Sequence, residues 1–330
     1  MRTAIPLIVL ATALACSLAT APAHARARVF VASYGNDSNP CTFGSPCKTF
    51  QQAVNVVDPG GEVTAIDSAG FGPINITKAV TITSPDGVEA GIVPAAGGDA
   101  IDINAGPTDA IVLRGLTLNG SGVGFNGVVF NSGGSLTVTN CVAQNFHSAG
   151  SGNITGNGIL LQPTNGTVNF VITNTIVANN QTIGIIYQPP SGSPVANIVI
   201  DHVTATGNSF IGINPNLLHA TGGSAVVSIA NSTVSNASHG IDFDNNALPL
   251  TASIDNVSVV GNAANGIVAF GTSKVLLGRS VVTGNFFSGI ANQTSPNTFF
   301  TYKDNRINGN GTDICSTSPC VPLNTTLVLQ

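Results

Sequence analysis

The sequence predicts a right-handed parallel β-helix, and three observations support this fold class. A sequence pattern repeats every 23–31 residues, the segments within each repeat alternate apolar and polar residues, and the repeats leave no room for a helix. A chain with strands but no intervening helices is not a doubly wound α/β protein, because that fold places a helix after almost every strand. We therefore expect an all-β solenoid.

The repeat is marked by a glycine followed by Ile or Val. This pair begins at Gly127, Gly158, Gly184, Gly212, Gly240, Gly266 and Gly289. Each of the last five glycines has an asparagine four positions earlier, namely Asn180, Asn208, Asn236, Asn262 and Asn285. Five or six residues before these asparagines lies a second polar column of Asn174, His202, Asn231, Asn256 and Arg279. Because the landmarks keep their spacing through successive units, the chain is internally repeated.

Each repeat holds about three short strands separated by turns rich in Asn and Gly. Segments such as "NFVITN", "ANIVID" and "TASIDN" alternate with period two, which is typical of strands. Units of this size bury a core only by stacking, so each strand is expected to pair with its counterpart one coil away. The aligned asparagines then form ladders in the turns. With looser strands at 63–67, 80–83, 100–103 and 110–118, about ten coils make a rod on the order of 50 Å long.

The first 25 residues have the pattern of a secretory signal peptide. Arg2 is followed by an apolar run and by the small-x-small site Ala23-His24-Ala25. The run is too short for a membrane anchor, and lipidation at Cys16 is a minor alternative because Ala13 stands where a larger aliphatic residue is usual. The remaining chain has nine Lys and Arg against 15 Asp and Glu, a formal net charge of −6. Such a surface does not favour nucleic acid or anionic lipid.

Residues 26–58 are expected to cap the solenoid, residues 59–311 to form it, and residues 312–330 to form a C-terminal cap or tail. An open end of a β-helix aggregates unless it is covered. The cap contains one predicted helix, with Ser45 as N-cap, Pro46 at its first position and Asp58-Pro59-Gly60 at its end. Its apolar stripe of Phe50, Ala53, Val54 and Val57 is suited to covering the first coil.

The cysteines indicate an oxidising compartment. Cys41 and Cys47 flank the approach to the predicted helix, and Cys315 and Cys320 lie near the C-terminus, so each pair is expected to form a local disulfide in an exported protein. Cys141 is left over, in a column beside inward-facing strand positions, which predicts a buried and unreactive thiol.

The segment "VFVASYGNDSNPCTFGSPCKTFQQAV" resembles the capping segment that opens many secreted right-handed β-helix proteins of the pectin-lyase-like superfamily. The resemblance covers residues 29–320 and is architectural. The superfamily includes pectate lyases, polygalacturonases, epimerases, phage tailspikes and proteins without an assigned activity, so it implies a fold and not one chemistry.

The strand after each repeat glycine is expected to point alternate residues outward. The first outward column is Val129, Leu160, Ile186, Asn214, Asp242, Val268 and Ala291. The second is Asn131, Gln162, Gln188, Asn216, Asp244, Phe270 and Gln293. The second column is a stripe of amides, which offers hydrogen-bond donors and acceptors to a ligand on the exposed strand face.

Asp242 and Asp244 are the candidate catalytic residues, with Asn214 and Asn216 beside them in the preceding coil and His239 at the rim. Two carboxylates on one strand face stand about 6.5–7 Å apart, near the spacing of an acid and base in an inverting glycosidase. The same oxygen-rich patch also suits Ca²⁺. Alternatively, the pair is one rung of a surface ladder without a ligand. No Lys or Arg lies on this strand or its aligned neighbours, so hydrolysis suits the site better than β-elimination.

The sequence thus favours an exported protein, secreted or periplasmic, that binds a polysaccharide, with processing of the polymer as an extension of that role. The expected ligand-binding residues are Asn214, Asn216, His239, Asn131, Gln162, Gln188 and Gln293. The competing interpretation is a structural or adhesive solenoid of the cell envelope with no glycan ligand. Whether the protein is an enzyme is left open between these two.

Overall fold

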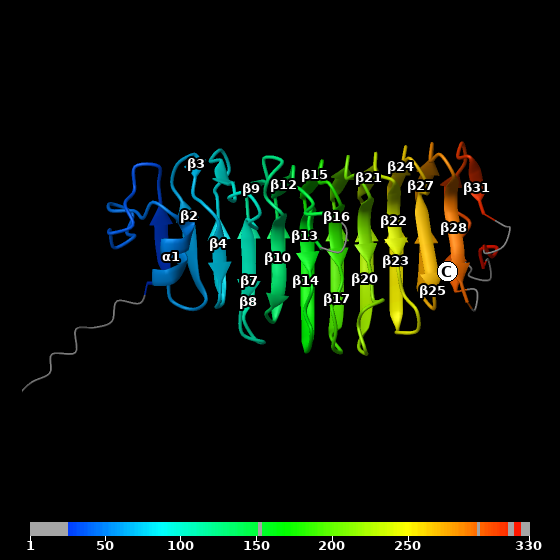
Figure 1. The fold of residues 1–330 in the computed structure, drawn as a ribbon, viewed down its shortest axis with the longest axis horizontal. Helices are drawn as coiled ribbons and strands as arrows, with labels where there is room; N and C mark the ends of the chain where they lie inside the picture. Colours follow the sequence, from blue (N-terminus) through cyan, green and yellow to red (C-terminus); the bar gives the residue numbers. More distant parts are fainter. Residues whose placement is uncertain (1–25, 151–153, 296–297, 316–319, 325–330) are drawn as a thin grey trace, which may run out of the picture.

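A computed structural model describes residues 26–150, 154–295, 298–315 and 320–324. The predicted signal peptide, residues 1–25, lies outside the described residues. The chain forms a rod in which three parallel sheets run along the long axis, with the N-terminal cap at the blue end in Figure 1. β2, β3 and β4 make the first turn of a solenoid with about nine full turns, and β29, β30 and β31 add a short final turn. The expectation of about ten coils agrees with this architecture.

Each strand pairs in parallel with the strand of the same sheet in the next turn. Sheet 1 consists of β1 (Arg28–Val31), β2 (Gly61–Ala65), β5 (Val80–Thr83), β8 (Ala110–Arg114), β11 (Ser135–Thr139), β14 (Thr167–Thr173), β17 (Val195–Asp201), β20 (Ser224–Ala230), β23 (Leu250–Asp255), β26 (Lys274–Gly278) and β29 (Phe299–Thr301). Sheet 2 consists of β3 (Ala69–Gly70), β6 (Ala90–Ile92), β9 (Leu116–Asn119), β12 (Val142–Gln144), β15 (Ile176–Ala178), β18 (Thr204–Thr206), β21 (Thr233–Ser235), β24 (Ser258–Val260), β27 (Val281–Thr283) and β30 (Arg306–Ile307).

Sheet 3 carries the strands that follow the repeat glycines. It consists of β4 (Ile74–Ile76), β7 (Ile101–Asn104), β10 (Asn126–Ser132), β13 (Asn157–Leu161), β16 (Ile183–Tyr187), β19 (Ile211–Pro215), β22 (His239–Phe243), β25 (Ile267–Gly271), β28 (Ser288–Thr294) and β31 (Thr312–Ile314). The predicted inward columns of this sheet are buried, as shown by Ile185, Ile241 and Phe243. Strands β1 and β31 lie in the segments predicted as caps and still pair with β2 and β28.

The turn between sheet 1 and sheet 2 explains the second polar column of the repeat. Asn174, Asn231 and Asn256 have positive φ angles of 47–53°, a left-handed conformation that Asn tolerates better than most residues. Their side chains also bond along the rod, since Asn256 donates to Asn231 at 2.8 Å. The column is therefore fixed first by backbone conformation and then by the ladder.

The asparagines before the repeat glycines form the second ladder, with one exception. Asn180 donates to Asn208 at 2.9 Å, and Asn262 donates to Asn285 at 2.8 Å, and all four are buried. Asn236, predicted to belong to this ladder, is instead exposed and has a φ of 54°.

The exception follows from the length of the turn that precedes β22. In the neighbouring coils a residue with a positive φ stands five residues before the repeat glycine, as Asn179 does before Gly184, whereas Asn236 stands four residues before Gly240. This turn is therefore one residue shorter. Ala237 takes the buried ladder position, and its N–H donates to Asn262.

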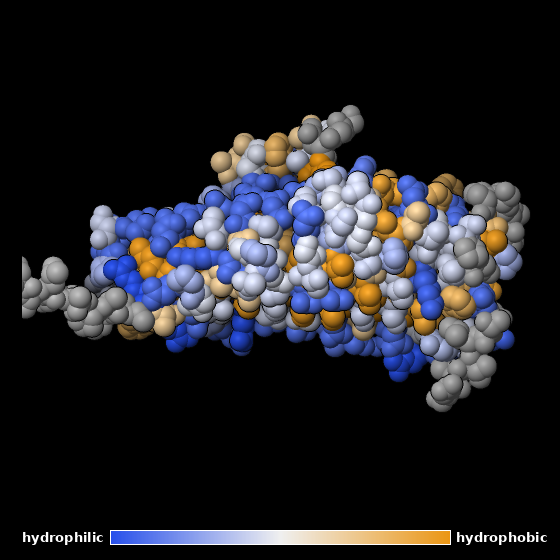
Figure 2. Space-filling model, turned by 90° about the horizontal axis from the view of Figure 1, so that it is seen from below, coloured by the Kyte–Doolittle hydropathy of each residue, from blue (hydrophilic) through white to orange (hydrophobic). Residues whose placement is uncertain are grey.

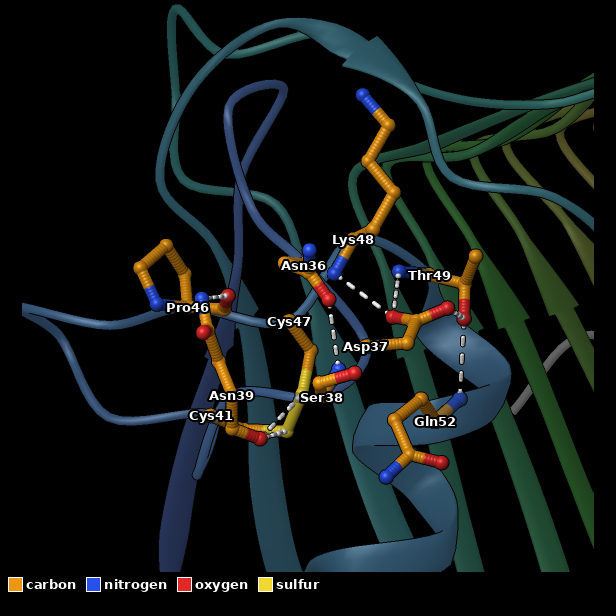
Figure 3. The surroundings of a disulfide bond; sticks show 10 residues. All are labelled: Asn36, Asp37, Ser38, Asn39, Cys41, Pro46, Cys47, Lys48, Thr49 and Gln52. Atoms are coloured by element: carbon orange, nitrogen blue, oxygen red, sulfur yellow. Dashed lines mark hydrogen bonds between the residues drawn. A yellow bond between two sulfur atoms is a disulfide. The ribbon is translucent and has the colours of Figure 1, made fainter.

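The N-terminal helix is shorter than predicted. α1 spans Phe50–Val56, and its N-cap is Thr49, whose hydroxyl accepts from the Gln52 N–H at 3.2 Å. Ser45 is not the N-cap, because Asp37 accepts hydrogen bonds from the N–H groups of Lys48 and Thr49 and keeps this segment extended (Figure 3). The predicted apolar stripe of α1 is buried against the first coil as expected.

The cysteines pair as predicted. Cys41 bonds to Cys47 beside the helix, as Figure 3 shows, and Cys315 bonds to Cys320 near the C-terminus. Cys141 is free and buried, and burial raises the pKa of its thiol to about 11, so the thiolate is not available near neutral pH.

α1 has seven residues, and no helix in the described ranges is long and apolar enough to cross a membrane.

Candidate functional site

The four side chains predicted to converge do lie together on sheet 3. β19 and β22 pair with Ile213 opposite Ile241, and the strands continue into a bridge between Asn216 and Asp244. This register places Asn214 beside Asp242 and Asn216 beside Asp244. The repeat alignment was sufficient to predict this arrangement, because strand register in a solenoid follows from the spacing of the repeats.

Both amides are hydrogen-bonded to the aspartates. The Asn214 Nδ2 group donates to the backbone oxygen of Asp242 at 2.8 Å and to Oδ2 of Asp244 at 3.1 Å. The Asn216 Nδ2 group donates to the same Asp244 oxygen at 3.3 Å, and its Oδ1 accepts from the Leu218 N–H. Asp244 thus accepts two amide N–H bonds, which favour its ionised form.

The first outward column is buried, contrary to the expectation of an exposed face. Asn214 is 2% exposed and Asp242 is 9% exposed. Further along the column, Val129, Leu160 and Ile186 are also buried and pack with Ile154 from the loop before β13. These apolar side chains are removed from water by packing against one another and against Ile154. The column therefore forms a second, external core on sheet 3.

The two carboxylates differ in environment. Burial and the neighbouring Asp244 raise the pKa of Asp242 to about 8, and the Asp242 Oδ1 atom has no hydrogen-bond partner among the described residues. Burial also raises the pKa of Asp244, while the Asn214 amide and the charge of His239 oppose that change. The pKa of Asp242 is therefore the more strongly raised of the two, because the Asn214 amide stabilises the Asp244 carboxylate and no such donor reaches the Asp242 Oδ1 atom.

A groove of about 200 Å³ opens beside Asp244. One part of its lining is apolar and consists of Ile154, Ile183, Ile186, Phe210 and Ile211. The other part is polar and consists of Asn157, Thr182, Gln188, Asn214, Asn216 and Asp244. Asp242 does not line the groove, so only one of the two predicted catalytic carboxylates faces it.

His239, predicted at the rim of the site, is not among the residues that line the groove. The side chain is half-buried, its ring centroid is 6.2 Å from that of Phe210, and its Nδ1 is 3.4 Å from the Asn265 amide. Burial lowers the pKa of His239, and the charge of Asp244 partly opposes the change. The lowered pKa favours the neutral form of the ring, which packs edge-to-face with Phe210.

The predicted amide stripe divides into separate parts. Asn131 donates to Asn104 at 3.1 Å, and Gln162 donates to Asn131 at 2.8 Å, so these amides bond to one another along the rod. Gln188 lines the groove. Gln293 lies two strands beyond Asp244, separated from it by the exposed Phe270, and is not part of the groove.

Sequence reasoning missed the apolar wall of the groove. Phe210 is 52% exposed and occupies the turn position that holds Thr182 in the preceding coil. An aromatic residue where another coil has a threonine is a signal that the alignment contains. Ile154 comes from a loop longer than its counterparts, and only the folded chain shows that it packs on Ile186 and its neighbours.

The described residues contain no group of three or more His, Cys, Asp and Glu side chains arranged to hold a metal ion. The Asp244 Oδ2 atom accepts from Asn214 and Asn216, and the Asn216 Oδ1 atom accepts from the Leu218 N–H. Calcium binding at this patch stays a prediction.

No protein-family model and no curated protein sequence matches the chain. Two solved structures share its fold. One is described as pectate lyase Pel9A, with a TM-score of 0.56 and 14% identity over 86% of this chain and 78% of that one. The other is a rhamnogalacturonan lyase, with a TM-score of 0.60 and 12% identity over 90% of this chain and 84% of that one.

At these identities the likeness concerns the fold alone. The sheets of stacked parallel strands and the two structural neighbours confirm the predicted all-β fold class. The chain is therefore a parallel β-helix whose fold resembles that of these two structures.

Proposed function

We propose that the groove on sheet 3 binds a carbohydrate chain outside the cytoplasm. The observation that carries the proposal is the lining of the groove, where Phe210 and isoleucines meet Asp244, Asn216 and Gln188. A sugar ring has apolar C–H faces and a rim of hydroxyl groups, so it needs an apolar wall and fixed polar groups together. The hydrogen bonds from Asn214 and Asn216 hold the Asp244 carboxylate in place before a ligand arrives.

The groove also has a direction that suits a polymer. Its lining residues come from β13, β16 and β19 and from the bridge position after β22, which are successive neighbours in sheet 3. The two structures that share the fold are described as a pectate lyase and a rhamnogalacturonan lyase, which supports a polymeric carbohydrate as ligand. From the viewpoint of Figure 2, hydrophobic residues form scattered patches among hydrophilic ones and not one continuous stripe along the rod.

The compartment is part of the same proposal. Two disulfides join cysteines close in the sequence, and such bonds persist in oxidising compartments. Polymeric carbohydrates are also found mainly outside the cytoplasm. Export by the predicted signal peptide would bring the groove to its ligand, and fractionation of cells that express the full chain tests this step.

Binding is tested by affinity gel electrophoresis against a panel of neutral and acidic polysaccharides. We expect retardation by at least one polymer, and we expect Phe210→Ala to weaken it about tenfold by removing the exposed wall. Asn197→Ala is the matched control, since this exposed amide lies on sheet 1 and should leave retardation unchanged. No retardation by any polymer would favour the structural or adhesive solenoid instead.

Hydrolysis is a second candidate function, favoured by two carboxyl groups on one strand face whose environments raise the pKa of Asp242 more strongly than that of Asp244. A general acid donates a proton to the leaving oxygen, and a carboxylate activates water. Sugar release by the wild type, Asp242→Asn and Asp244→Asn tests it. Loss of release in both variants supports hydrolysis by the pair, whereas release that survives both substitutions places the chemistry elsewhere.

A further inference from the structure

The charged residues of the chain are unevenly distributed over the three sheets. Lys and Arg are absent from all ten strands of sheet 3, from β4 to β31, and from the lining of the groove. All nine Lys and Arg residues after residue 25 fall within the described residues. Sheet 1 and the turn after it carry Arg28, Arg114, Lys274 and Arg279, and the others lie in the cap, after β4 or near the last turn.

Two basic residues follow strands of sheet 3 closely in sequence, Lys78 after β4 and Lys274 after β25. Lys274 begins β26 of sheet 1, and its Nζ lies 5.8 Å from the centroid of the Phe300 ring on β29 of the same sheet. Lys78 follows β4 and donates to the Val57 carbonyl of the cap. Six strand spacings separate β4 from β22 in the order of sheet 3, which is about 29 Å. This exceeds the screening length of about 8 Å at physiological ionic strength, so Lys78 does not offset the charge of Asp244.

Carboxylates occupy sheet 3 at both ends of its buried apolar column. Asp102 lies on β7 in the same column as Val129, with Asp99 just before the strand, and Asp242 lies five strand spacings further along. Burial raises the pKa of Asp102, and the charge of Asp99 adds to this shift. A polymer lying along the apolar column would meet acidic groups at each end.

We propose, as a refinement that rests on the proposed carbohydrate binding, that the groove takes sugar units without an anionic group and rejects uronates. A uronate carboxylate near Asp244 adds a like charge where no cation compensates it, and like charges a few ångströms apart repel even at intermediate effective dielectric constants. Neutral hydroxyls instead donate to the Asp244 carboxylate and accept from amide groups such as that of Gln188.

The proposed preference for neutral sugars differs from the ligand that the shared fold alone would suggest. One structural neighbour is titled a pectate lyase, and pectate is an anionic polymer. The described residues of sheet 3 supply no cationic side chain to such a chain. The specificity proposed for this protein is thus carried by its own charge distribution.

The test uses three acidic polymers, polygalacturonate, alginate and hyaluronan. Each is compared with its own carboxyl-reduced form, which differs from it only at C6. We expect at least one carboxyl-reduced polymer to retard the full chain in affinity gels, and its acidic parent to bind about tenfold more weakly at 20 mM salt or below, with a smaller gap at high salt. Asp244→Asn should bring the affinities for the reduced polymer and for its acidic parent closer together.

A control variant separates the groove from the overall charge of the molecule. Asp86→Asn removes one exposed charge at the turn after β5, far from sheet 3, and should leave the ratio between acidic and reduced polymer unchanged. Acidic parents that bind as tightly as their reduced forms, or more tightly, would overturn the refinement and leave the carbohydrate proposal standing. Failure of every polymer to bind would overturn both.

Discussion

Two halves of one column on sheet 3 show how the same fold position is used in opposite ways. In β10, β13 and β16 the column holds Val129, Leu160 and Ile186, which are buried under Ile154. In β19 and β22 it holds Asn214 and Asp242, which are just as deeply buried. The first half excludes water and has no polar group to satisfy. The second half buries polar groups whose hydrogen bonds and protons must then be accounted for.

The difference shows where stability has been exchanged for a polar site. An apolar residue at position 242 would pack beside Val268, since the register pairs these two positions. The aspartate there leaves Oδ1 without a partner among the described residues, which is costly for a buried oxygen. Such exceptions to local packing rules are expected at functional sites.

The largest effect is expected from placing a charge in the apolar half. Ile186→Asp buries a carboxylate among isoleucines, and an uncompensated buried charge should lower the free energy of unfolding by about 3–5 kcal/mol. Val199→Asp is the control, because Val199 on sheet 1 is 40% exposed and the same substitution there keeps the charge in water. Denaturant unfolding measures both. Equal losses would mean that the external core does not exclude water.

The second prediction concerns Asp242 and pH. Because its pKa in the folded protein is raised to about 8 from an ordinary value of 3.8, the folded state holds the proton more tightly than the unfolded state. The stability that this protonated carboxyl contributes is present below the unfolded pKa and is lost as pH rises towards 8. The melting temperature of the wild type should therefore fall between pH 4 and pH 8.

Asp242→Asn removes this dependence and should be more stable than the wild type at pH 8. The gain should be about 1.4 kcal/mol for each unit by which burial has raised the Asp242 pKa. Thermal melts of both proteins across this pH range provide the measurement. A wild type whose melting temperature is flat over the range would show that Asp242 is hydrated and not buried.

An intermediate effect is expected at the amide that joins the two aspartates. Asn214→Ala removes the donor to the Asp242 backbone oxygen and one of the two donors to Asp244. Losing both of these hydrogen bonds at a buried position should cost about 1–3 kcal/mol of unfolding free energy, although Asn216 still donates to Asp244. Asn197→Ala, at an exposed amide of sheet 1, should cost about 0.5 kcal/mol or less. Urea titrations with a similar loss in both variants would contradict the special role of Asn214.

The smallest effect is expected at a carboxylate on the opposite side of the rod. Asp255 bonds to the exposed Arg279 guanidinium, which lowers the pKa of the carboxyl and gives stability that is lost as pH falls. Asp255→Asn should cost less than about 1 kcal/mol at pH 7, because exposed ion pairs contribute little. This loss of unfolding free energy is opposite in sign to the gain expected for Asp242→Asn at pH 8. If both substitutions change stability in the same direction, burial does not distinguish the two aspartates.

Much of the architecture could be predicted from the sequence because a solenoid repeats its own register. Once Gly184, Gly212 and Gly240 are aligned, the partner of every residue in these strands is known, and the meeting of Asn214 with Asp242 follows. The disulfides could be predicted because the two cysteines of each pair are close in the sequence. The burial of Cys141 could be predicted because the repeat places it in a column beside inward-facing positions. The N-cap of α1 was mispredicted because Asp37, eleven residues before Lys48, binds the N–H groups that would otherwise begin the helix.

The sequence by itself determined which residues share a strand face, since side chains alternate with period two and the repeat aligns them. Only the tertiary structure decided which face is exposed. Outward residues are covered where Ile154 reaches across sheet 3, and Phe210 makes a wall where one turn carries an aromatic residue. Exposure depends on loops that the repeat does not constrain, and for that reason the environments of Asp242 and Asp244 became distinct only in the folded chain.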